Sequence, residues 1–554
     1  MNPFDERQLS WFTCEASDGS SYLFYIKPVV ERKDGLWLHA DKYGIITTTM
    51  KNAIILSAAV VCALPLFAKI ELGTPFADHM VLQRGRPVPV WGKAAPGRTV
   101  EVSFADATVS AEVASDGSWR VALPAMEACK EPRTLAVAEY EPCAFWFSKK
   151  IDETKVEDVL VGEVWMCAGQ SNTDCPIWGK SPRYRDGMGA VAVASTVKPT
   201  VRLVKTPRIP SMKPRFDYRV QWVKMTPDDF KKEFAGSSMP SAMGYYFALE
   251  LANALDIPIG LVDSSWGGTN IDTWTPPSGY AGKASLADVA ALPILPKAEF
   301  EAARASGAYP SRGVFNGYHK QPSMLWNGMV AAFAPMAFRG MIWYQGCSNS
   351  GEPQFYCDKM HALYDGWAKE FANPSMKLYF VQIVSWGHNI APFQIAQEKF
   401  AKEEPNAAMA VINDVENLKD IHPNDKRTVA KRLALHALKR DYGFESICPD
   451  SPTPKSWKVE KGAYVVEFND ATGFYIYNDD RSLETCFEIC DAAGNWHQAK
   501  VLNVEKNGLV NGSALKVAAD GVADPRGLRY MFCAPWHGSL YGDTGLPVGA
   551  FEIK

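Results

Sequence analysis

Four short segments of the chain carry residue types that acyl-transfer chemistry uses. The first is Gly169–Asn172, in which Ser171 follows an apolar, strand-like run. A serine at a strand-to-helix turn presents its hydroxyl openly and directs its backbone N–H toward a developing oxyanion. Serine is also a frequent N-cap of helices, so this tetrapeptide alone leaves that simpler interpretation open.

The second and third segments supply hydrogen-bond donors. Ser264–Thr269 contains the pair Gly267 and Gly268, and the backbone of paired glycines can approach a ligand closely. Trp343–Asn349 follows another apolar run, and the amide of Asn349 could donate to an oxyanion. The simpler alternatives are a tight turn for the glycines and a helix cap for the asparagine.

The fourth segment, Asp420–Pro423, contains His422. Histidine titrates near neutral pH, as a general base requires, and Asp420 could orient its ring. An ordinary surface-loop histidine is the alternative. Together the four segments supply a nucleophile, oxyanion donors and a base, which is the set that acyl transfer needs.

The elements that must position these segments alternate between strand and helix over residues 156–445. Six apolar runs of strand length are predicted: Val161–Cys167, Val201–Val204, Ile257–Val262, Gly340–Tyr344, Leu378–Val384 and Ala407–Ile412. Helices are predicted around Met243–Leu255 and Asp425–Arg440. This alternation indicates an α/β domain with a doubly wound parallel sheet and helices on both faces. Sites gather at the carboxyl ends of such strands, where all four segments fall.

Shorter strand patterns flank this α/β region. Residues 69–155 alternate apolar and polar residues between proline and glycine turns, which predicts a β-sandwich domain. Residues 446–554 return to short strands after a proline-rich linker, which predicts a C-terminal β-rich domain.

Composition excludes several classes of protein. The chain has 58 basic and 62 acidic residues among 554, so no basic excess exists to neutralise the phosphates of a nucleic acid. Its 47% hydrophobic and 22% charged residues are ordinary globular values and exclude a disordered or coiled-coil protein. The 12 cysteines are too sparse for a disulfide scaffold, and their pairing cannot be read from spacing.

One apolar run, Ala53–Ala68, bears on the compartment. It is shorter than the ~20 residues of a membrane span, and it follows Met50 and Lys51 and ends in a small residue, as a secretory signal peptide does. We therefore predict a signal peptide at residues 50–68, with residues 1–49 an extension upstream of the true start. A buried or membrane-anchoring helix is the alternative. Cleavage after Ala68 predicts an exported protein with no stable membrane insertion.

Beyond single motifs, the sequence resembles the sialate O-acetylesterases of the SGNH/GDSL hydrolase superfamily. The blocks that carry the resemblance are Asp78–Arg84, Pro87–Gly92, Gly162–Asn172, Gly260–Thr269, Asn327–Met329, Trp343–Asn349, Ile421–Pro423, Lys426, Pro525–Tyr530 and Leu540–Tyr541. They cover nearly everything from about residue 70 onward. The resemblance implies a serine esterase that removes O-acetyl groups from sialic acid or a related sugar without a metal or other cofactor.

The candidate site residues fall into three groups on this basis. They are the catalytic Ser171, His422 and Asp420; the oxyanion-hole Gly267, Gly268 and Asn349; and the substrate-binding Gln170 and Gln345. The backbone of Ser171 is expected to contribute to the oxyanion hole as well.

The sequence departs from the family's pattern at three positions. Thr173 replaces a methionine that usually follows the Ser-Asn pair, and Cys347 replaces a glutamate. Lys419 stands where the superfamily commonly has the orienting aspartate, which leaves Asp420, Asp414 or a Ser–His dyad as alternatives. These departures keep two other functions open: an esterase for another glycan such as xylan, and a non-catalytic glycan-binding protein.

Overall fold

The structure is a computed structural model that describes residues 10–15, 21–26, 69–142, 148–178, 188–233, 239–310, 313–387, 389–415, 418, 420–478, 482–533 and 536–554. The chain divides into two compact units, residues 1–66 and 67–554. In the first unit, β1 (Ser10–Glu15) and β2 (Ser21–Ile26) pair antiparallel. The signal peptide predicted at residues 50–68 lies outside the described residues.

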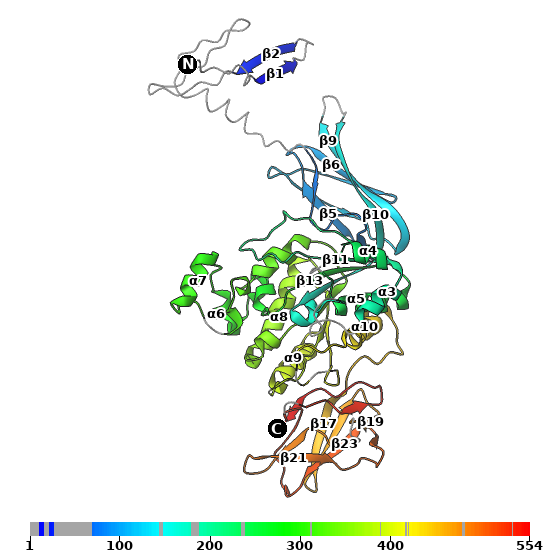
Figure 1. The fold of residues 1–554 in the computed structure, drawn as a ribbon, viewed down its shortest axis with the longest axis vertical. Helices are drawn as coiled ribbons and strands as arrows, with labels where there is room; N and C mark the ends of the chain where they lie inside the picture. Colours follow the sequence, from blue (N-terminus) through cyan, green and yellow to red (C-terminus); the bar gives the residue numbers. More distant parts are fainter. Residues whose placement is uncertain are drawn as a thin grey trace. The chain divides into compact units, whose positions relative to one another are not determined.

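A largely parallel sheet runs through the middle of the second unit (Figure 1), with the strand order β12-β11-β13-β10-β14-β15-β16. Its strands are β10 (Ser148–Gly169), β11 (Lys198–Lys205), β12 (Val223–Met225), β13 (Ile259–Ser265), β14 (Gly340–Tyr344), β15 (Lys377–Val381) and β16 (Ala407–Ala410). The β11–β12 pair is antiparallel and the other neighbours are parallel. Each of the six predicted strands overlaps one of these, and the predicted bounds of β14 are those observed.

Helices cover both faces of this sheet. On β15, the ring of Tyr379 stacks on His436 of α10 (Lys426–Tyr442), whereas the next residue, Phe380, packs against Phe400 of α9 (Ala391–Glu403). Successive side chains of a strand point to opposite faces, so α9 and α10 lie on opposite sides. The remaining helices are α2 (Ser171–Asp174), α3 (Gly189–Ser195), α4 (Pro227–Glu233), α5 (Ala242–Leu255), α6 (Ala287–Ala290), α7 (Lys297–Ala305) and α8 (Pro353–Glu370). Helix α5 packs on α10, and α8 packs on α9. A largely parallel sheet with helices on both faces confirms the predicted α/β class.

Short turns of 3-10 or π-helix link these elements. They are η1 (Asp272–Trp274), η2 (Pro277–Tyr280), η3 (Ala284–Leu286), η4 (Gly313–Phe315), η5 (Tyr318–Lys320), η6 (Trp326–Val330), η7 (Ala331–Phe333) and η8 (Cys347–Asn349). All but η8 lie between β13 and β14, so this long connection is built from these turns and the short helices α6 and α7.

Two further sheets pack together ahead of the central one. One has the order β3-β5-β8, and in the other β6 pairs β7 and β9, while β10 pairs β9 and β4. The strands are β3 (Glu71–Leu72), β4 (Val81–Gln83), β5 (Val88–Lys93), β6 (Thr99–Phe104), β7 (Ala107–Glu112), β8 (Ser118–Leu123) and β9 (Cys129–Pro142). Alternate residues of β6 and β8 are buried in the same apolar core, as in a sandwich.

The predicted domain boundary at residues 155–156 falls inside β10. This strand pairs with β9 through its first half and with β13 and β14 through its second. One continuous strand therefore joins the sandwich to the central sheet, and no linker separates them. The turn signals that mark a linker are absent from this stretch because the chain stays extended.

The C-terminal strands form a seven-stranded sheet, β17-β18-β23-β21-β20-β24-β26, and a three-stranded sheet, β22-β19-β25. Their bounds are β17 (Thr453–Glu460), β18 (Ala463–Asn469), β19 (Gly473–Ile476), β20 (Phe487–Cys490), β21 (Trp496–Val501), β22 (Leu509–Asn511), β23 (Ala514–Ala519), β24 (Gly527–Tyr530), β25 (Leu540–Gly542) and β26 (Phe551–Ile553). A disulfide joins Cys486 to Cys533. Within the described residues, no helix has both the length and the apolar character that crossing a bilayer requires.

Candidate active site

Ser171 begins α2 at the carboxyl end of β10, where the chain makes a sharp turn. Gly169 makes this turn possible, because its φ is +143° and a Cβ there would lie 2.4 Å from the carbonyl oxygen of Tyr344. Ser171 Oγ lies 3.0 Å from His422 Nε2. His422 Nδ1 in turn lies 3.1 Å from Asp420 Oδ1, and the same oxygen accepts the backbone N–H of His422 at 3.0 Å. The structure thus brings together the three residues predicted to be catalytic.

Asp414, the alternative orienting acid, is engaged elsewhere. Arg432 of α10 donates to both of its carboxylate oxygens, at 2.6 and 2.7 Å. Because a carboxylate held in this bidentate pair is fixed in direction, Asp420 is the acid placed to orient the histidine ring.

Two buried side chains fasten the histidine loop to the serine helix. Asn172 Nδ2 donates to the carbonyl oxygen of Ile421 at 3.0 Å. Lys426 Nζ donates to Asn172 Oδ1 at 2.7 Å and to the carbonyl oxygen of Pro423 at 2.6 Å. Both side chains are fully buried, so these bonds face no competition from water. The clamp holds the residues on either side of His422 against α2.

Gly267 lies beside Ser171, but its N–H is already bonded. A Cβ at Gly267 would lie 3.5 Å from Ser171 Cβ, so no bulky side chain separates the two residues. The Gly267 N–H donates to Asp174 Oδ2 at 3.2 Å. An oxyanion would have to replace this carboxylate before it could use that N–H. Gly268 follows with a φ of +73° on the exposed side of the turn.

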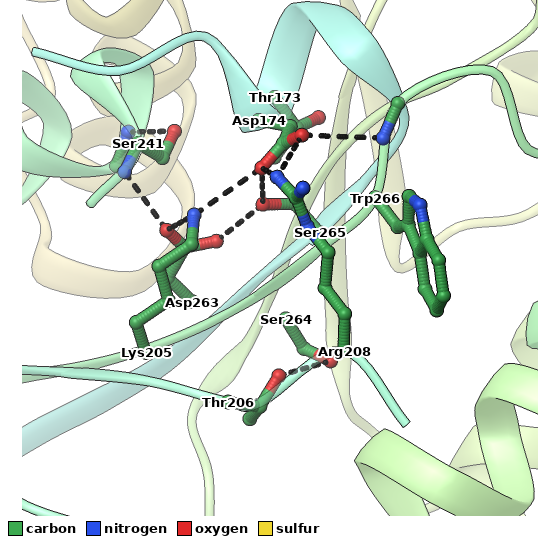
Figure 2. A network of polar contacts seen from close by, with 12 residues as sticks. Thr173, Asp174, Lys205, Thr206, Arg208, Ser241, Asp263, Ser264, Ser265 and Trp266 are labelled. Carbon is green, nitrogen blue, oxygen red and sulfur yellow. Dashed lines mark hydrogen bonds and ion pairs between the residues drawn. The ribbon is translucent and has the colours of Figure 1, made fainter. Parts of the chain in front are cut away.

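Figure 2 shows that Asp174 is the meeting point of a charged network beneath this turn. Arg208 Nη2 donates to both oxygens of Asp174, at 2.6 and 2.5 Å, and Lys205 Nζ donates to Oδ1 at 3.3 Å. Lys205 also donates to Asp263 Oδ2 at 3.0 Å, and Ser265 Oγ donates to Asp263 Oδ1 at 2.6 Å. Burial by itself would lower the pKa of Lys205, but the carboxylates of Asp263 and Asp174 raise it overall. The ammonium therefore stays charged and ties α2 to β11 and β13.

Asn349 is fully buried in η8, and its amide is held at both ends. Its Oδ1 accepts the backbone N–H of Ile271 at 3.0 Å and Gln345 Nε2 at 2.8 Å. Its Nδ2 donates to Glu352 Oε2 at 3.0 Å. These bonds fix the direction of the amide and engage one of its two N–H groups.

A buried ion pair stands behind this arrangement. Lys359 Nζ lies 2.8 Å from Glu352 Oε2 and 2.9 Å from Asp272 Oδ2. Burial opposes the charge, but the two carboxylates raise the pKa of Lys359 overall. The charged lysine thereby anchors the glutamate that holds Asn349.

Gln170 and Gln345, both predicted to bind substrate, each make hydrogen bonds within the protein. Gln170 Oε1 accepts the backbone N–H groups of Gly346 and Ser348, at 3.0 and 3.3 Å. Gln345 Oε1 accepts from the Tyr356 hydroxyl at 2.7 Å. Both glutamines are buried, and a buried amide needs partners inside the protein. The prediction that they bind substrate is therefore not supported by their placement.

The two substituted positions have structural partners. Thr173 Oγ1 donates to the carbonyl oxygen of Tyr344 at 2.9 Å and so ties α2 to the end of β14. Burial raises the pKa of the Cys347 thiol to about 12, so this side chain is neutral where the family carries a carboxylate.

The network around Asp174 was missed in the sequence. The sequence did contain a signal, which was acidic residues among apolar ones. Asp263 lies within the buried strand β13, and Asp174 is the last residue of α2, the helix that begins at Ser171. Their partners are Lys205, which ends β11, and Arg208, which follows it; both are far from Asp263 in sequence, so the pattern could not connect them. Among the described residues, the side chains that could together hold a metal ion are Cys357, His361 and Glu403, and none of them is a predicted site residue.

Comparisons with known proteins agree with this geometry. Residues 315–439 match the sequence model of a family described as carbohydrate esterase, sialic acid-specific acetylesterase. Human sialate O-acetylesterase is 29% identical over 430 residues, which are 70% of this chain and 75% of the human protein. The mouse enzyme is 28% identical over 429 residues, covering 69% and 75% of the two chains. The crystal structure of a carbohydrate acetylesterase from Xanthomonas citri superposes with a TM-score of 0.71 at 27% identity, covering 88% of this chain and 99% of that one.

The fold and these matches define a carboxylic ester hydrolase of the carbohydrate esterase class. Over the matched residues the chain is similar to the sialate O-acetylesterases.

Proposed function

We propose that the protein is a serine esterase that removes O-acetyl groups from sialic acid or a related acetylated sugar. The observation that carries this proposal is the 3.0 Å contact between Ser171 Oγ and His422 Nε2, with Asp420 on the far nitrogen of the ring. Under this proposal, the α/β domain is an SGNH-type hydrolase domain.

The reaction proceeds in two halves. His422 takes the hydroxyl proton of Ser171 as Oγ attacks the acetyl carbonyl carbon, and a tetrahedral oxyanion forms. The intermediate collapses, the bond to the sugar oxygen breaks, and His422 returns the proton to that oxygen. Water then attacks the acetyl-serine with His422 again as base, which releases acetate and restores Ser171. Asp420 holds the ring and stabilises its protonated form.

The oxyanion is stabilised by the backbone N–H of Ser171, by the Asn349 amide and by the glycine turn. Asn349 has a second N–H beyond the one that Glu352 accepts, and its other bonds fix where that N–H points. Gly268 offers an N–H on the exposed side of the turn, whereas the Gly267 N–H becomes available only when Asp174 releases it.

Two side chains near Ser171 support a sugar substrate. The half-buried indole of Trp266 stacks on His319, with ring centroids 4.5 Å apart and planes 5° from parallel. A rigid aromatic surface next to the nucleophile suits the apolar face of a sugar ring. Arg208 has 43% of its side chain exposed while it holds Asp174. Its remaining guanidinium N–H groups could bind a carboxylate, which favours sialic acid over a neutral sugar such as acetylated xylose.

We also propose that the protein is exported. The predicted signal peptide motivates this, and the Cys486–Cys533 disulfide supports it, because disulfides persist in oxidising compartments outside the cytoplasm.

The test is acetate release from a panel of O-acetylated sialic acids and O-acetylated neutral sugars. We expect the wild-type protein to release acetate and Ser171→Ala to release none above background. Arg208→Ala should lower acetate release from the acidic substrates selectively and leave acetate release from the neutral substrates little changed. Full activity of Ser171→Ala would contradict the proposed nucleophile, and a wild-type preference for neutral sugars would favour the xylan-type alternative.

A further inference from the structure

Three side chains of different chemistry meet where α8 packs on α9, away from Ser171. Cys357 and His361 are four residues apart on α8, so they lie on one face of that helix, and Glu403 is the last residue of α9. Cys357 Sγ lies 3.3 Å from Glu403 Oε2, and His361 Nε2 lies 3.1 Å from the same oxygen. The three donor atoms are all within 4.8 Å of one another.

These separations are close to those of a tetrahedral metal site. Zinc binds sulfur at about 2.3 Å and nitrogen or carboxylate oxygen at about 2.1 Å, so the edges of its tetrahedron are about 3.6 Å for sulfur–oxygen and about 3.4 Å for nitrogen–oxygen. The observed distances are 3.3 and 3.1 Å. A movement of the shared carboxylate oxygen by a few tenths of an ångström would make room for the ion.

The donor set and its charge suit zinc better than a hard cation. Thiolate and imidazole select zinc and similar borderline metals, whereas magnesium and calcium prefer all-oxygen ligands. A Cys357 thiolate and a Glu403 carboxylate together carry a charge that balances a divalent ion. In the structure the Cys357 thiol and the His361 imidazole both donate to Glu403 Oε2. A bound ion would replace these two hydrogen bonds. The Cys357 proton passes to solvent when the ion binds.

The site is supported on one side and open on the other. The ring of His361 packs edge-on against Phe400 with centroids 4.8 Å apart, which limits its rotation. Cys357 is buried, whereas Glu403 has 46% of its side chain exposed. Water can therefore reach the fourth position of a tetrahedral ion. Lys399 Nζ is 3.8 Å from Glu403 Oε1, which is the oxygen turned away from the cysteine and the histidine.

We propose that Cys357, His361 and Glu403 form a zinc-binding site that fastens α8 to α9. The site does not depend on the proposed esterase reaction, since it joins side chains of α8 and α9 that are not among the predicted esterase residues. Its effect is on stability: α8 carries Lys359 and Tyr356, which support Asn349 and Gln345, so fastening α8 steadies that part of the scaffold.

The experiment uses the full chain, stripped of metal by a chelator and then titrated with zinc against a fluorescent zinc indicator. We expect one tight zinc per chain and a rise in the melting temperature on binding. Cobalt(II), used as a spectroscopic substitute, should produce a thiolate-to-cobalt charge-transfer band. Cys357→Ala should abolish that band and weaken zinc binding by more than about tenfold, since even residues behind the ligands are worth about 10- to 100-fold.

Matched controls separate this site from adventitious binding. Glu403→Gln should weaken zinc binding, whereas Glu404→Gln, at the neighbouring position, should not. Cys448→Ala removes an exposed free cysteine elsewhere and should keep the cobalt band. Glu403 is at the surface, so its variant tests the proposal even if Cys357→Ala fails to fold. Absence of stoichiometric zinc, or equal zinc affinities of Glu403→Gln and Glu404→Gln, would overturn the proposal.

Discussion

At the scale of single residues, the alignment of Ser171 with His422 depends on side chains that lie behind them. Asn172 and Lys426 bind the backbone on both sides of His422 and also bind each other. The sequence motifs named both residues but could not show that they form a clamp, because they are 254 positions apart. The sequence also could not show that Gln170, predicted to bind substrate, accepts a hydrogen bond from the buried backbone of a neighbouring loop.

Replacement of Lys426 by Met should reduce turnover more than substrate binding. The change removes the clamp and leaves Asn172 Oδ1 and the Pro423 carbonyl without a donor, at a cost of about 1–3 kcal/mol for each unsatisfied buried group. We expect kcat to fall at least about tenfold with a smaller change in KM, together with a lower melting temperature. Lys431→Met, at an exposed position of the same helix, is the control. Equal kinetics of the two variants would show that the clamp does not position His422.

Replacement of Asn349 by Ala tests the oxyanion hole. Loss of one such donor typically costs about 10²–10³ in turnover, or about 3–4 kcal/mol. We expect a loss of that size in kcat with little change in KM, measured on a chromogenic acetate ester by steady-state kinetics. If kcat is unchanged while only thermal stability falls, Asn349 is a structural residue of η8 and has no role toward the oxyanion.

At the scale of elements, the sequence predicted the central sheet well because buried parallel strands are short apolar runs with little competition from other patterns. The strand predicted at Gly340–Tyr344 has those bounds in the structure, and the helix predicted at Asp425–Arg440 is α10. The boundary predicted at residues 155–156 falls inside β10, because the first half of this strand is polar and exposed and its pattern resembles the edge of a separate domain. Only the pairing of β10 with both β9 and β13 reveals one strand in two sheets.

The packing of α10 on β15 makes stability sensitive to acid through His436. This histidine is fully buried, its Nε2 lies 3.2 Å from the Met409 carbonyl oxygen, and burial lowers its pKa to about 4. An unfolded chain protonates histidine near pH 6.5, so between pH 6.5 and about 4 the unfolded state binds more protons and the free energy of unfolding falls as pH falls.

Denaturant unfolding from pH 7 to pH 4 measures this effect. His436→Gln should flatten the fall in unfolding free energy over that window, whereas His537→Gln, which removes an exposed histidine, should leave the slope as in the wild type. A slope in His436→Gln identical to that of the wild type would mean that other groups cause the acid sensitivity.

At the scale of the whole described unit, the C-terminal sheets contact the loop that leads from β16 toward His422. Asn413 Nδ2 donates to the carbonyl oxygen of Val548 at 3.1 Å, and the Gly538 N–H donates to the Asn413 carbonyl oxygen at 2.9 Å. The sequence predicted these strands from their alternation and the proline-rich linker, but cysteine spacing could not show which cysteines pair. Cys486 and Cys533 meet because the strand order places β20 next to β24.

The Cys486–Cys533 disulfide should contribute substantially to stability. It closes a loop with a sequence separation of 47, for which chain-entropy arguments give about 4 kcal/mol. We expect the double variant Cys486→Ser/Cys533→Ser to unfold at clearly lower denaturant concentration than the wild type under non-reducing conditions. Cys448→Ser is the control for loss of a cysteine outside the disulfide. A reducing agent should shift the wild type toward the double variant and leave the variant itself unmoved; no shift would mean that the bond does not stabilise the protein.

The proposed function requires Ser171 to be a nucleophile that His422 activates. Covalent labelling by an organophosphonate ester, read by mass spectrometry of the intact protein and of its peptides, tests it most directly. We expect one adduct per chain on the peptide that contains Ser171, labelling at least about tenfold slower in His422→Ala, and no labelling of that peptide in Ser171→Ala. Absence of label on the wild-type protein, or equal labelling of the wild type and Ser171→Ala, would contradict Ser171 as the nucleophile. Absence of label would favour a glycan-binding protein without esterase activity.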